Sequence, residues 1–383
     1  MKAVKYMNLE DVRKEIDEID EKLLGLFLRR MELAKAAMRE KMYCGKPLVD
    51  MRREREILNR VSQKSGDLSV YSRRLFKELM ALSRSYQGST SQGETKLSKS
   101  IENALISDTV FPRSASVACQ GIEGANSQQA ADRLFTQGNI VYFESFAEVA
   151  DAVRSGICDY GVLPIENSSY GSIHAVYDIL KDGNLSIVRS VKLCIHHELL
   201  AKPGTTLSDV KEIISHEQAI GQCGDYLKKI GNSVKINPCA NTALAAKIAS
   251  ENEGVAAISS PACAELYGLS KVTDESIQNS DNNYTRFVCV SAKPAVFPGA
   301  SRLSFLATLK HEPGELYKLV SAIDARDVNI SKLESKPIVG RDFDFMFFIN
   351  IEASVHEHGI IAMLEEIERN CESFVFLGNY QEI

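Results

Sequence analysis

The chain has 383 residues, 44% of them hydrophobic and 25% charged, which is typical of a globular protein and long enough for two or three domains. Its apolar stretches are far too short to span a membrane and no secretory pattern opens it, so we expect a cytoplasmic protein without a membrane partner. Residues 1–90 carry 20 Lys and Arg against 14 Asp and Glu, whereas the rest carries 25 against 37, so only the N-terminal part is basic enough to suggest nucleic acid.

A first long helix is predicted from Leu9, with charged residues where core residues are expected. The apolar positions at three- and four-residue spacing are Leu9, Val12, Ile16, Ile19, Leu23 and Leu26. The same stripe then continues through Arg30, Leu33 and Ala37 to Lys41. Because burial of an unpaired cation is costly, Arg30 and Lys41 need an anionic partner inside the fold.

Two further helices repeat this pattern. In the second, the polar residues Asp50, Arg53 and Glu54 share a face with two apolar residues, Ile57 and Val61. In the third, Leu75 and Leu79 are followed at four-residue steps by Ser83 and Gln87. The basic residues interleave with acids such as Asp17 and Glu18, which favours an internal site for a small polyanion over a nucleic-acid surface.

Each polar residue also has an ordinary explanation. Arg30 could extend to water, and Lys41 could complement the dipole at a helix end. Asp50 could cap the second helix, Ser83 could bond its own backbone, and Arg13 could be a solvated charge. All of these explanations would have to hold at once across three helices, so we favour the anion site.

Residues 9–87 resemble the all-helical chorismate mutase domain that begins bifunctional chorismate mutase/prephenate dehydratases. The segments that carry the resemblance are residues 12–16, 19–24, Arg29-Arg30, Lys41, Pro47-Leu48-Val49-Asp50, Arg53-Glu54-Arg55 and Ser83-Arg84-Ser85-Tyr86-Gln87. The resemblance implies that chorismate is bound by Arg13, Arg30, Lys41, Asp50, Arg53, Glu54, Ser83 and Gln87. It also implies a homodimer or higher homo-oligomer in which Arg13 reaches the partner's pocket.

The rearrangement of chorismate to prephenate suits these residue types. It is pericyclic, so the site needs no nucleophile and acts by holding a reactive conformer and stabilising separated charge. Arginine matches the two substrate carboxylates because its planar fork can pair with them through two hydrogen bonds. By resemblance, Arg13 and Arg30 take the carboxylates and Arg53 assists. Lys41 and Gln87 are then the catalytic residues at the ether oxygen, with Asp50 and Glu54 on the ring hydroxyl.

A polar stretch after Gln87, followed by a short helix near residues 101–106, predicts a linker over residues 92–112. From Ser116 onward strands alternate with helices, which is typical of an α/β sheet. The predicted strands are 116–119, 140–143, 160–164, 185–196, 213–215, 234–237 and 256–259, and the helices between them are 127–137, 147–155, 219–230 and 243–251. Four polar loops, 121–127, 164–171, 215–218 and 240–243, follow strands and are expected to converge on a carboxylate-binding cleft.

Residues 115–291 resemble prephenate dehydratase through Pro164-Ile165-Glu166-Asn167-Ser168, Leu266-Tyr267-Gly268-Leu269 and Asn283-Tyr284-Thr285-Arg286-Phe287, with Asn279 upstream. The resemblance implies two α/β lobes, like those of a periplasmic binding protein, with prephenate between them and Thr285 as the catalytic residue. The candidates for holding prephenate are Asn167, Ser168, Ser215, Gln222, Thr242, Thr285, Arg286 and Phe287. For Arg286, a structural ion pair is an equal alternative. The family usually has Tyr and Pro where Asn126 and Glu217 stand here.

After residues 293–299 a third module is predicted with the order strand, helix, strand, strand, helix, strand, which indicates a ferredoxin-like α+β sheet. Its predicted elements are 302–309, 314–325, 328–335, 343–351, 357–371 and 374–377. It is similar to the ACT domain that senses amino acids at the end of these enzymes. By resemblance, phenylalanine binds Gly314, Glu315, Leu316, Glu334 and Ser335. Lys336 replaces the usual Arg and cannot form the same two-pronged hydrogen bond.

Together these resemblances imply a multidomain bifunctional enzyme of phenylalanine biosynthesis, inhibited by phenylalanine and without cofactor or metal. The nine cysteines form no C-x-x-C pair, and we expect His196-His197 and His356-Glu357-His358 to be surface residues. The expected domains are 1–91, 92–112 as linker, 113–292 and 300–380. A non-catalytic sensor of aromatic ligands is the alternative, which intact catalytic-type positions disfavour; a basic module that binds nucleic acid would require steep salt dependence.

Overall fold

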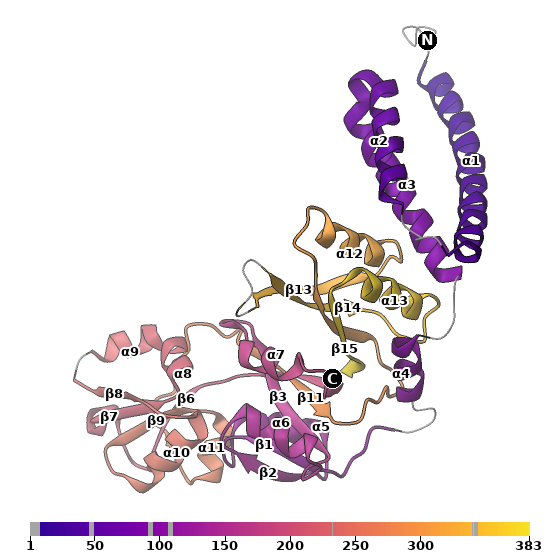
Figure 1. The fold of residues 1–383 in the computed structure, drawn as a ribbon. Coiled ribbons are helices and arrows are strands. Elements are labelled where there is room, and N and C mark those ends of the chain that lie inside the picture. The colour runs from indigo at the N-terminus through magenta and orange to yellow at the C-terminus, as the bar shows by residue number, and fades with distance from the viewer. Residues whose placement is uncertain are drawn as a thin grey trace.

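The structure, a computed structural model, describes residues 8–45, 50–90, 95–105, 110–231, 233–338, 340 and 344–383. The described chain forms a helical N-terminal part, a two-lobed α/β part and a C-terminal α/β part (Figure 1). No helix within these residues is long and apolar enough to cross a membrane.

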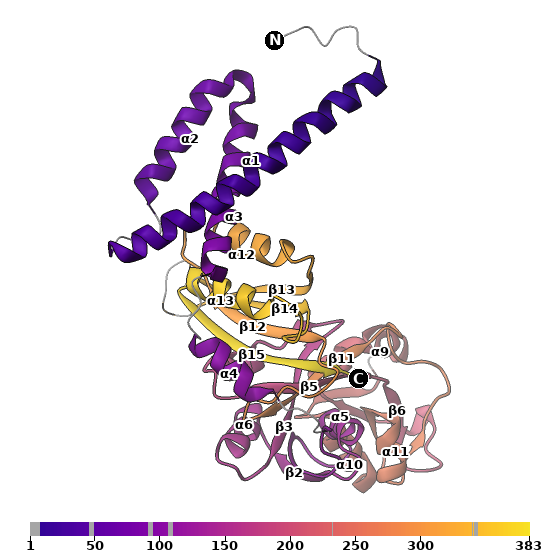
Figure 2. The ribbon, with the colours of Figure 1, turned by 90° about the vertical axis from the view of Figure 1, so that its right-hand side faces the viewer.

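The N-terminal part consists of α1 (Leu9–Tyr43), α2 (Met51–Ser65), a 3-10 turn (Gly66–Leu68) and α3 (Ser69–Thr90). The side chain of Asn8 caps α1 by accepting a hydrogen bond from the backbone N–H of Asp11 at 2.9 Å. In Figures 1 and 2, α2 and α3 form a hairpin, and α1 crosses the C-terminal half of α3. The rest of α1 extends away from the hairpin.

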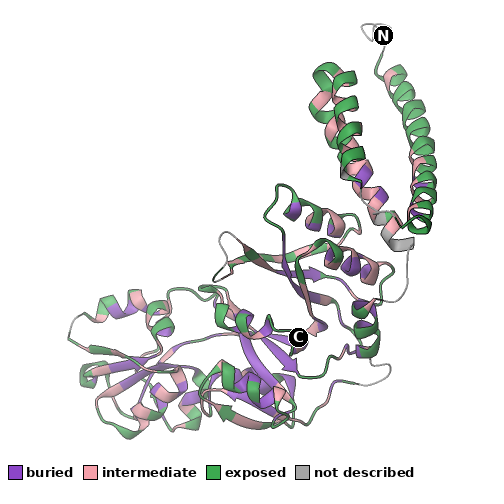
Figure 3. Cartoon of the chain, in the orientation of Figure 1, coloured by how far each residue is buried: buried purple, intermediate pink, exposed green. Residues whose placement is uncertain are grey.

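The apolar stripe of α1, which was predicted to be buried, is largely exposed in the described chain. Leu26 is 69% exposed, and Ile16, Ile19, Leu23 and Leu33 are each about half exposed. Figure 3 shows the length of α1 as mostly exposed surface. The 35 residues of α1 make it about 50 Å long, far more than the α2–α3 hairpin can cover.

The first α/β lobe surrounds a sheet in the order β5-β11-β3-β1-β2, with β4 paired to β3. Its elements are β1 (Ser116–Gln120), α5 (Asn126–Leu134), β2 (Asn139–Phe143), α6 (Phe146–Arg154), β3 (Tyr160–Asn167), β4 (Gly171–Ser172), α7 (His174–Leu180), β5 (Ser186–Cys194) and β11 (Tyr284–Ser291). β1 pairs in parallel with β2 and β3, whereas β11 is antiparallel to both β3 and β5. Alternate residues of these strands pack against α5 on one face of the sheet and against α6 and α7 on the other.

The second lobe is inserted between β5 and β11, so the chain crosses from lobe to lobe twice. Its sheet has the order β10-β6-β9-β7-β8. Its elements are β6 (Glu198–Ala201), a 3-10 turn (Leu207–Asp209), β7 (Glu212–Ser215), α8 (Glu217–Gln222), α9 (Gly224–Ile230), β8 (Lys235–Pro238), α10 (Thr242–Glu251), β9 (Val255–Ser259), α11 (Pro261–Leu266) and β10 (Ser270–Lys271). The two crossings run side by side, because the N–H of Ile195 donates to the carbonyl of Asn283 at 2.8 Å.

The C-terminal part has the strand and helix order predicted from the sequence. Its elements are β12 (Arg302–Thr308), α12 (Glu315–Asp324), β13 (Asn329–Pro337), β14 (Phe345–Glu352), α13 (Ile360–Asn370) and β15 (Ser373–Glu382). The antiparallel sheet has the order β13-β14-β12-β15. The end of β15 pairs in parallel with β5, so this sheet continues into the first lobe (Figure 2).

The segment predicted as a linker contributes to the C-terminal core. Helix α4 (Lys96–Ala104) buries Leu97, Ile101 and Ala104 in the same apolar cluster as Leu303 and Phe305. The hydroxyl of Thr95, which caps α4, also donates to the carboxylate of Glu365 at 2.7 Å. Residues 95–104 are therefore a structural part of the C-terminal unit, because one face of α4 is apolar enough to be buried.

Candidate active sites

Arg30, Ser83 and Gln87 come together where α1 crosses α3. The Arg30 guanidinium donates to the carbonyl of Leu79 at 2.6 Å and to the hydroxyl of Ser83. The amide of Gln87 donates to the carbonyl of Ala34 at 2.7 Å. Burial lowers the pKa of Arg30, and both of these partners of its side chain are uncharged. Arg30 is thus a half-buried cation available to an anion.

Three of the other residues predicted to bind chorismate, Asp50, Arg53 and Glu54, have partners outside this group in the described part of the chain. Glu54 pairs with Arg84, which links α2 to α3. The side chain of Asp50 caps α2 by accepting from the backbone N–H of Arg53 at 3.0 Å, as one of the ordinary explanations predicted. Arg53 is exposed and pairs with Glu56 at 3.4 Å. Ser83 also donates to the carbonyl of Leu79, so its local backbone bond is present as well.

Arg13 and Lys41 lie on α1 at either side of Arg30. Arg13 is exposed and Lys41 is half-buried. Arg30 follows Arg13 by 17 positions, which correspond to about 25 Å along the helix, so Arg13 cannot reach the Arg30 group of its own chain.

A hydrogen-bonded chain of polar side chains occupies the junction of the two α/β lobes. Asn167, at the end of β3, donates through Nδ2 to Oγ1 of Thr285 on β11 and to Oδ1 of Asn283, both at 2.9 Å. Gln222, from α8 of the second lobe, donates to the same Asn283 oxygen at 3.3 Å. His197, at the first crossing, lies 2.7 Å from Oε1 of Gln222. Three predicted residues, Asn167, Gln222 and Thr285, are therefore united by Asn283.

The backbone fixes the orientation of the Asn167 amide. Its Oδ1 accepts hydrogen bonds from the N–H groups of Ser169 at 2.9 Å and Tyr170 at 3.1 Å. Nδ2 must therefore be the atom that points to Thr285, and it can only donate. Since the Thr285 oxygen accepts this bond, its own O–H remains available to donate to a ligand.

Two members of this hydrogen-bonded set of side chains, Asn283 and His197, were not predicted as site residues. Asn283 is only 2% exposed, and its Nδ2 has no hydrogen-bond partner in the described structure. His197 is 7% exposed, so the prediction that it is a surface histidine is wrong. Burial lowers the pKa of His197, which the hydrogen bond to Gln222 opposes and the nearby His196 reinforces. The feature that could have indicated Asn283 and His197 as site residues is their position, because both lie where the polypeptide crosses between the two lobes.

The remaining residues that were predicted to bind prephenate have different contacts. The Ser168 hydroxyl bonds the backbone of Asn282 and Tyr284 at 2.9 Å each, which braces the start of β11. The fully buried Ser215 donates to the carbonyl of Ile258 at 2.6 Å. Thr242 is half-buried at the first turn of α10. Phe287 is 2% exposed and belongs to the apolar core of the first lobe.

Arg286 lies outside the lobe junction, so its assignment to prephenate binding is not supported. Its guanidinium pairs with the carboxylates of Glu166 and Glu382. The reason is strand geometry, because the side chain after Thr285 must point to the opposite face of β11. The alternative of a structural ion pair describes its environment.

The four polar loops lie in contact in pairs. A Cβ at Gly121 would lie 3.8 Å from Nδ2 of Asn241, which joins the first loop to the fourth. The Tyr170 hydroxyl donates to the carbonyl of Gln218 at 3.1 Å, which joins the second loop to the third. Each of these two first-lobe loops therefore contacts one loop of the second lobe, and a shared cleft formed by all four loops stays a prediction. Among the residues that the structure describes, no three or more His, Cys, Asp or Glu are grouped to hold a metal.

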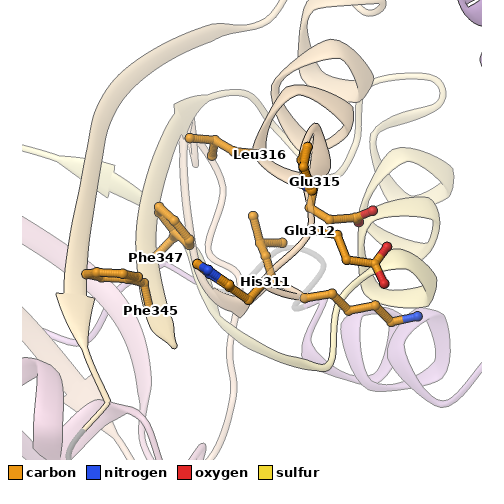
Figure 4. A pocket seen from close by; sticks show the side chains of 9 residues that line it. His311, Glu312, Glu315, Leu316, Phe345 and Phe347 are labelled. Atoms are coloured by element: carbon orange, nitrogen blue, oxygen red, sulfur yellow. The ribbon is translucent and has the colours of Figure 1, made fainter. Parts of the chain in front are cut away.

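A separate pocket of about 340 Å³ opens at the start of α12 (Figure 4). Its lining residues are Leu309, Lys310, His311, Glu312, Pro313, Glu315, Leu316, Phe345 and Phe347. Figure 4 shows Phe345 and Phe347 beside His311 on one side and the carboxylates of Glu312 and Glu315 on the other. Two of the predicted effector residues, Glu315 and Leu316, line this pocket.

The other predicted effector residues do not line it. Gly314 precedes α12 with a φ of 96°, and a Cβ there would meet no atom within 4 Å. Within the described chain, space does not exclude a side chain at position 314, and the left-handed backbone is what favours Gly. Glu334 accepts from the Ser172 hydroxyl at the first lobe, and Ser335 pairs with Phe347 in the ladder between β13 and β14.

Comparison with known proteins identifies the two sets of residues. The chorismate mutase type II family model matches residues 12–88, and the prephenate dehydratase model matches residues 117–295. The bifunctional chorismate mutase/prephenate dehydratase of Escherichia coli K12 is 30% identical over 379 residues, which cover 96% of this chain and 95% of the relative. The chain belongs to this family.

Two further relatives each match about 70% of this chain. Arogenate dehydratase/prephenate dehydratase 2 of Arabidopsis thaliana is 37% identical over 278 residues, which cover 69% of this chain and 72% of that protein. The crystal structure of prephenate dehydratase in complex with L-Phe from Arthrobacter aurescens is 28% identical, with a TM-score of 0.63, and the match covers 70% of this chain and 89% of that one.

Membership of this family assigns one reaction to each enzyme domain. The helical domain is a chorismate mutase, which converts chorismate to prephenate. The two-lobed domain is a prephenate dehydratase, which converts prephenate to phenylpyruvate for phenylalanine biosynthesis. The group around Arg30 lies in the chorismate mutase domain. The hydrogen-bonded side chains from His197 to Thr285 lie in the prephenate dehydratase domain.

Proposed function

We propose that Thr285 is the proton donor of the dehydratase reaction and that Asn167 activates it. Prephenate loses its ring carboxylate as CO₂, and the electron pair of that C–C bond enters the ring as the C–O bond to the ring hydroxyl breaks. The departing oxygen takes the Thr285 proton and leaves as water, and solvent returns a proton to Thr285. The orientation of Asn167 carries this proposal, because only an acceptor role at Thr285 Oγ1 leaves the O–H free.

Asn167 also supports the electrostatics of this step. Its Nδ2 lies 2.9 Å from the oxygen on which negative charge grows as the proton leaves. A preorganised donor at that point stabilises the transition state, and the effect is large in a site from which water is excluded. Thr285 is 8% exposed, so little water competes for this hydrogen bond. Gln222 and the free Nδ2 of Asn283 are placed to bind the polar groups of prephenate.

In the mutase domain, we infer that Arg30 binds a carboxylate of chorismate and that Ser83 and Gln87 line the same site. The substrate would replace the carbonyl and hydroxyl that Arg30 contacts here, giving the cation a charged partner. Lys41, Asp50, Arg53 and Glu54 complete the set in the arrangement that the resemblance implies.

We further infer a homodimer or a higher homo-oligomer formed through α1. The apolar residues of α1 are exposed on a single chain, and Arg13 cannot reach its own Arg30. A second copy covering α1 accounts for both observations. Replacing Ile16 and Leu23 by Asp should convert the oligomer to smaller species in sedimentation analysis and abolish mutase turnover. Retention of both the assembly and mutase activity would contradict this arrangement.

The C-terminal unit is proposed to be an ACT domain of ferredoxin-like fold that binds phenylalanine as a feedback inhibitor. Its pocket combines carboxylates for an ammonium group, Lys310 for a carboxylate, and Phe345 and Phe347 for an apolar side chain. These are the groups that a zwitterionic aromatic amino acid requires. The Arthrobacter relative was crystallised with L-Phe. The domain limits 1–91, 113–292 and 300–380 and a cytoplasmic location remain predictions.

A coupled assay of the purified protein tests these assignments. Chorismate should yield phenylpyruvate with prephenate as intermediate, and supplied prephenate should yield phenylpyruvate directly. Absence of turnover with both substrates would instead favour a non-catalytic sensor of aromatic ligands.

A further inference from the structure

The face of the first-lobe sheet opposite Thr285 is in contact with the C-terminal unit. Strands β3 and β11 pair so that Thr285 lies opposite Asn167 and, one position further, Arg286 lies opposite Glu166. Successive residues of a strand point to opposite faces of the sheet. The Thr285–Asn167 pair therefore faces the lobe junction, and the Arg286–Glu166 pair faces the C-terminal unit.

Arg286 is held by one carboxylate from each side of this contact. It pairs with Glu166 of β3 and with Glu382, the last residue of β15. Its Nη2 also lies 3.4 Å from Oε1 of Glu382. The side chains of Arg286, Glu166 and Glu382 are only 19%, 22% and 18% exposed, so salt and water screen these charges less than those of a surface pair.

Both carboxylates have a second cationic partner from the C-terminal unit. Lys332 of β13 pairs with the other oxygen of Glu166, and its Nζ also donates to the Ser172 hydroxyl at 2.7 Å. Arg302 of β12 lies 3.0 Å from Glu382. Glu334 lies 3.5 Å from Lys332 and Glu352 lies 4.0 Å from Arg302, so three cations and four carboxylates alternate in this network. Because each charge is balanced only by its neighbours, the loss of one shifts the others.

We propose that this ion-pair network makes Arg286 a positioning residue for the dehydratase, with Glu382 and Lys332 of the C-terminal unit holding the β3–β11 pair on which Thr285 and Asn167 meet. This inference rests on the proposed role of Thr285. Arg286 and Thr285 are consecutive, so a shift of the Arg286 backbone moves Thr285 Oγ1 relative to Asn167. Chemistry that depends on a 2.9 Å contact is sensitive to such shifts, since displacement by about 1 Å can cost about 100-fold in rate.

The proposal differs in its kinetics from direct binding of prephenate by Arg286. A positioning network affects the chemical step and lowers kcat with little change in KM, whereas a lost substrate contact raises KM. It also implies that the C-terminal unit supports dehydration in the absence of any effector.

The experiment uses the full chain and two variants from different strands of the C-terminal unit, Glu382→Gln and Lys332→Met. Each should lower the dehydratase kcat by about 2- to 30-fold, the range for residues that act through coupling rather than contact. Their KM for prephenate and their mutase turnover should stay within about 2-fold of the parent, which is below the smallest coupling expected. Lys332→Arg keeps the cation and should restore most of the lost kcat.

Asp178→Asn provides the matched control. Asp178 of α7 pairs with Lys336 of β13 across the same contact but does not touch Arg286 or its partners. It should therefore leave the dehydratase kcat unchanged. Equal effects of Asp178→Asn and Glu382→Gln, or a change in KM alone, would overturn the proposal, as would unchanged kcat in both test variants.

Thr285→Ala separates this inference from the proposed function. If Thr285→Ala is inactive while Glu382→Gln and Lys332→Met are unaffected, only the positioning role fails. If Thr285→Ala retains normal dehydratase activity, the proposed site itself fails.

Discussion

Asn167 and Thr285 face each other from adjacent strands, with Nδ2 of Asn167 donating to Oγ1 of Thr285 at 2.9 Å. Two backbone N–H groups hold the other end of the Asn167 amide, so the direction of this bond is fixed. The bond couples the end of β3 to the start of β11, where the proposed proton donor lies. Two of the predictions below depend on it.

Removal of the Thr285 hydroxyl should eliminate dehydration and spare rearrangement. Thr285→Ala should lower dehydratase kcat by about 10²–10³-fold, the usual effect of losing one preorganised donor at the reacting oxygen. Prephenate should then accumulate from chorismate, because the mutase site lies in another domain. Thr285→Ser keeps the hydroxyl and should retain part of the activity. Product analysis by chromatography follows both compounds, and normal phenylpyruvate formation by Thr285→Ala would disprove the role of Thr285.

Asn167→Asp tests the direction of the hydrogen bond. A carboxylate would accept the Thr285 proton instead of donating to its oxygen, so the O–H would no longer be free for the substrate. The expected loss is about 10- to 150-fold in kcat, equivalent to a charge-assisted hydrogen bond of about 1.5–3 kcal/mol. Ser169→Ala, which keeps the backbone N–H that orients Asn167, serves as control. Near-normal kcat in Asn167→Asp would show that Thr285 does not depend on a donated bond.

The sequence predicted helices and strands well where the hydrophobic periodicity was strong. It predicted poorly the features that depend on how segments distant in sequence pack together. Alternating strands and helices located β1, α6 and α10 to within a few residues. The same reading missed β11, the strand that carries Thr285, because its apolar run follows a long polar segment from which no strand was expected. It also treated residues 95–104 as linker, since a short amphipathic helix does not show from sequence alone what it packs against.

The site residues likewise fall into those that the sequence motifs located and those that only the structure revealed. Motif resemblance located Asn167, Gln222 and Thr285, which the structure joins through hydrogen bonds. It could not show that Arg286 points to the opposite face, which is decided by strand alternation, nor that His197 is buried at the crossing between lobes. The apolar stripe of α1 was predicted to be buried, but it is largely exposed in the described chain, so periodicity alone did not show what would cover it.

Arg30→Ala should abolish mutase activity while leaving the dehydration of supplied prephenate intact. Loss of the partner of a substrate carboxylate in a half-buried site costs about 2–5 kcal/mol, which lowers the rate by at least about 30-fold. Arg29→Ala is the matched control, because Arg29 is exposed and pairs with Glu32 on the surface of α1. The two variants are compared by chorismate consumption. Similar rates for both would exclude Arg30 from the mutase site.

The buried His197 should make the dehydratase domain less stable in acid. Burial lowers its pKa in the folded state below the ordinary value of 6.5, so above that value both states are neutral and nothing is lost. As the pH falls below about 6.5, the unfolded chain binds a proton that the folded chain does not, and stability decreases. His197→Gln cannot titrate and should show a shallower loss between pH 7 and pH 5. Denaturant midpoints measured across this range test it.

A matched comparison for this pH dependence is His216→Gln. Burial also lowers the pKa of His216, whereas the neighbouring Glu217 raises it. His216 caps α8 rather than bonding Gln222, so His216→Gln should leave the contribution of His197 in place. Parallel pH profiles for the parent and His197→Gln would show that His197 does not contribute to the acid sensitivity.

The last prediction separates two reasons for glycine at position 314, next to the proposed phenylalanine pocket. Its φ of 96° is a left-handed conformation that costs a β-branched residue about 1–2 kcal/mol or more, whereas Asn tolerates it better. A Cβ there meets nothing within 4 Å, so a side chain is not excluded by space in the single chain. If conformation is the reason, Gly314→Val should distort the turn before Glu315 and weaken inhibition by phenylalanine, and Gly314→Asn should preserve it.

Typical coupling of about 1–3 kcal/mol would correspond to a shift of roughly 5- to 150-fold in affinity, and prephenate should weaken phenylalanine binding by the same factor. Phenylalanine titrations of dehydratase activity measure this in both variants, with the uninhibited rate as internal control. Equal loss in Gly314→Asn and Gly314→Val would point to crowding by a second copy, and unchanged inhibition in both would place the effector elsewhere.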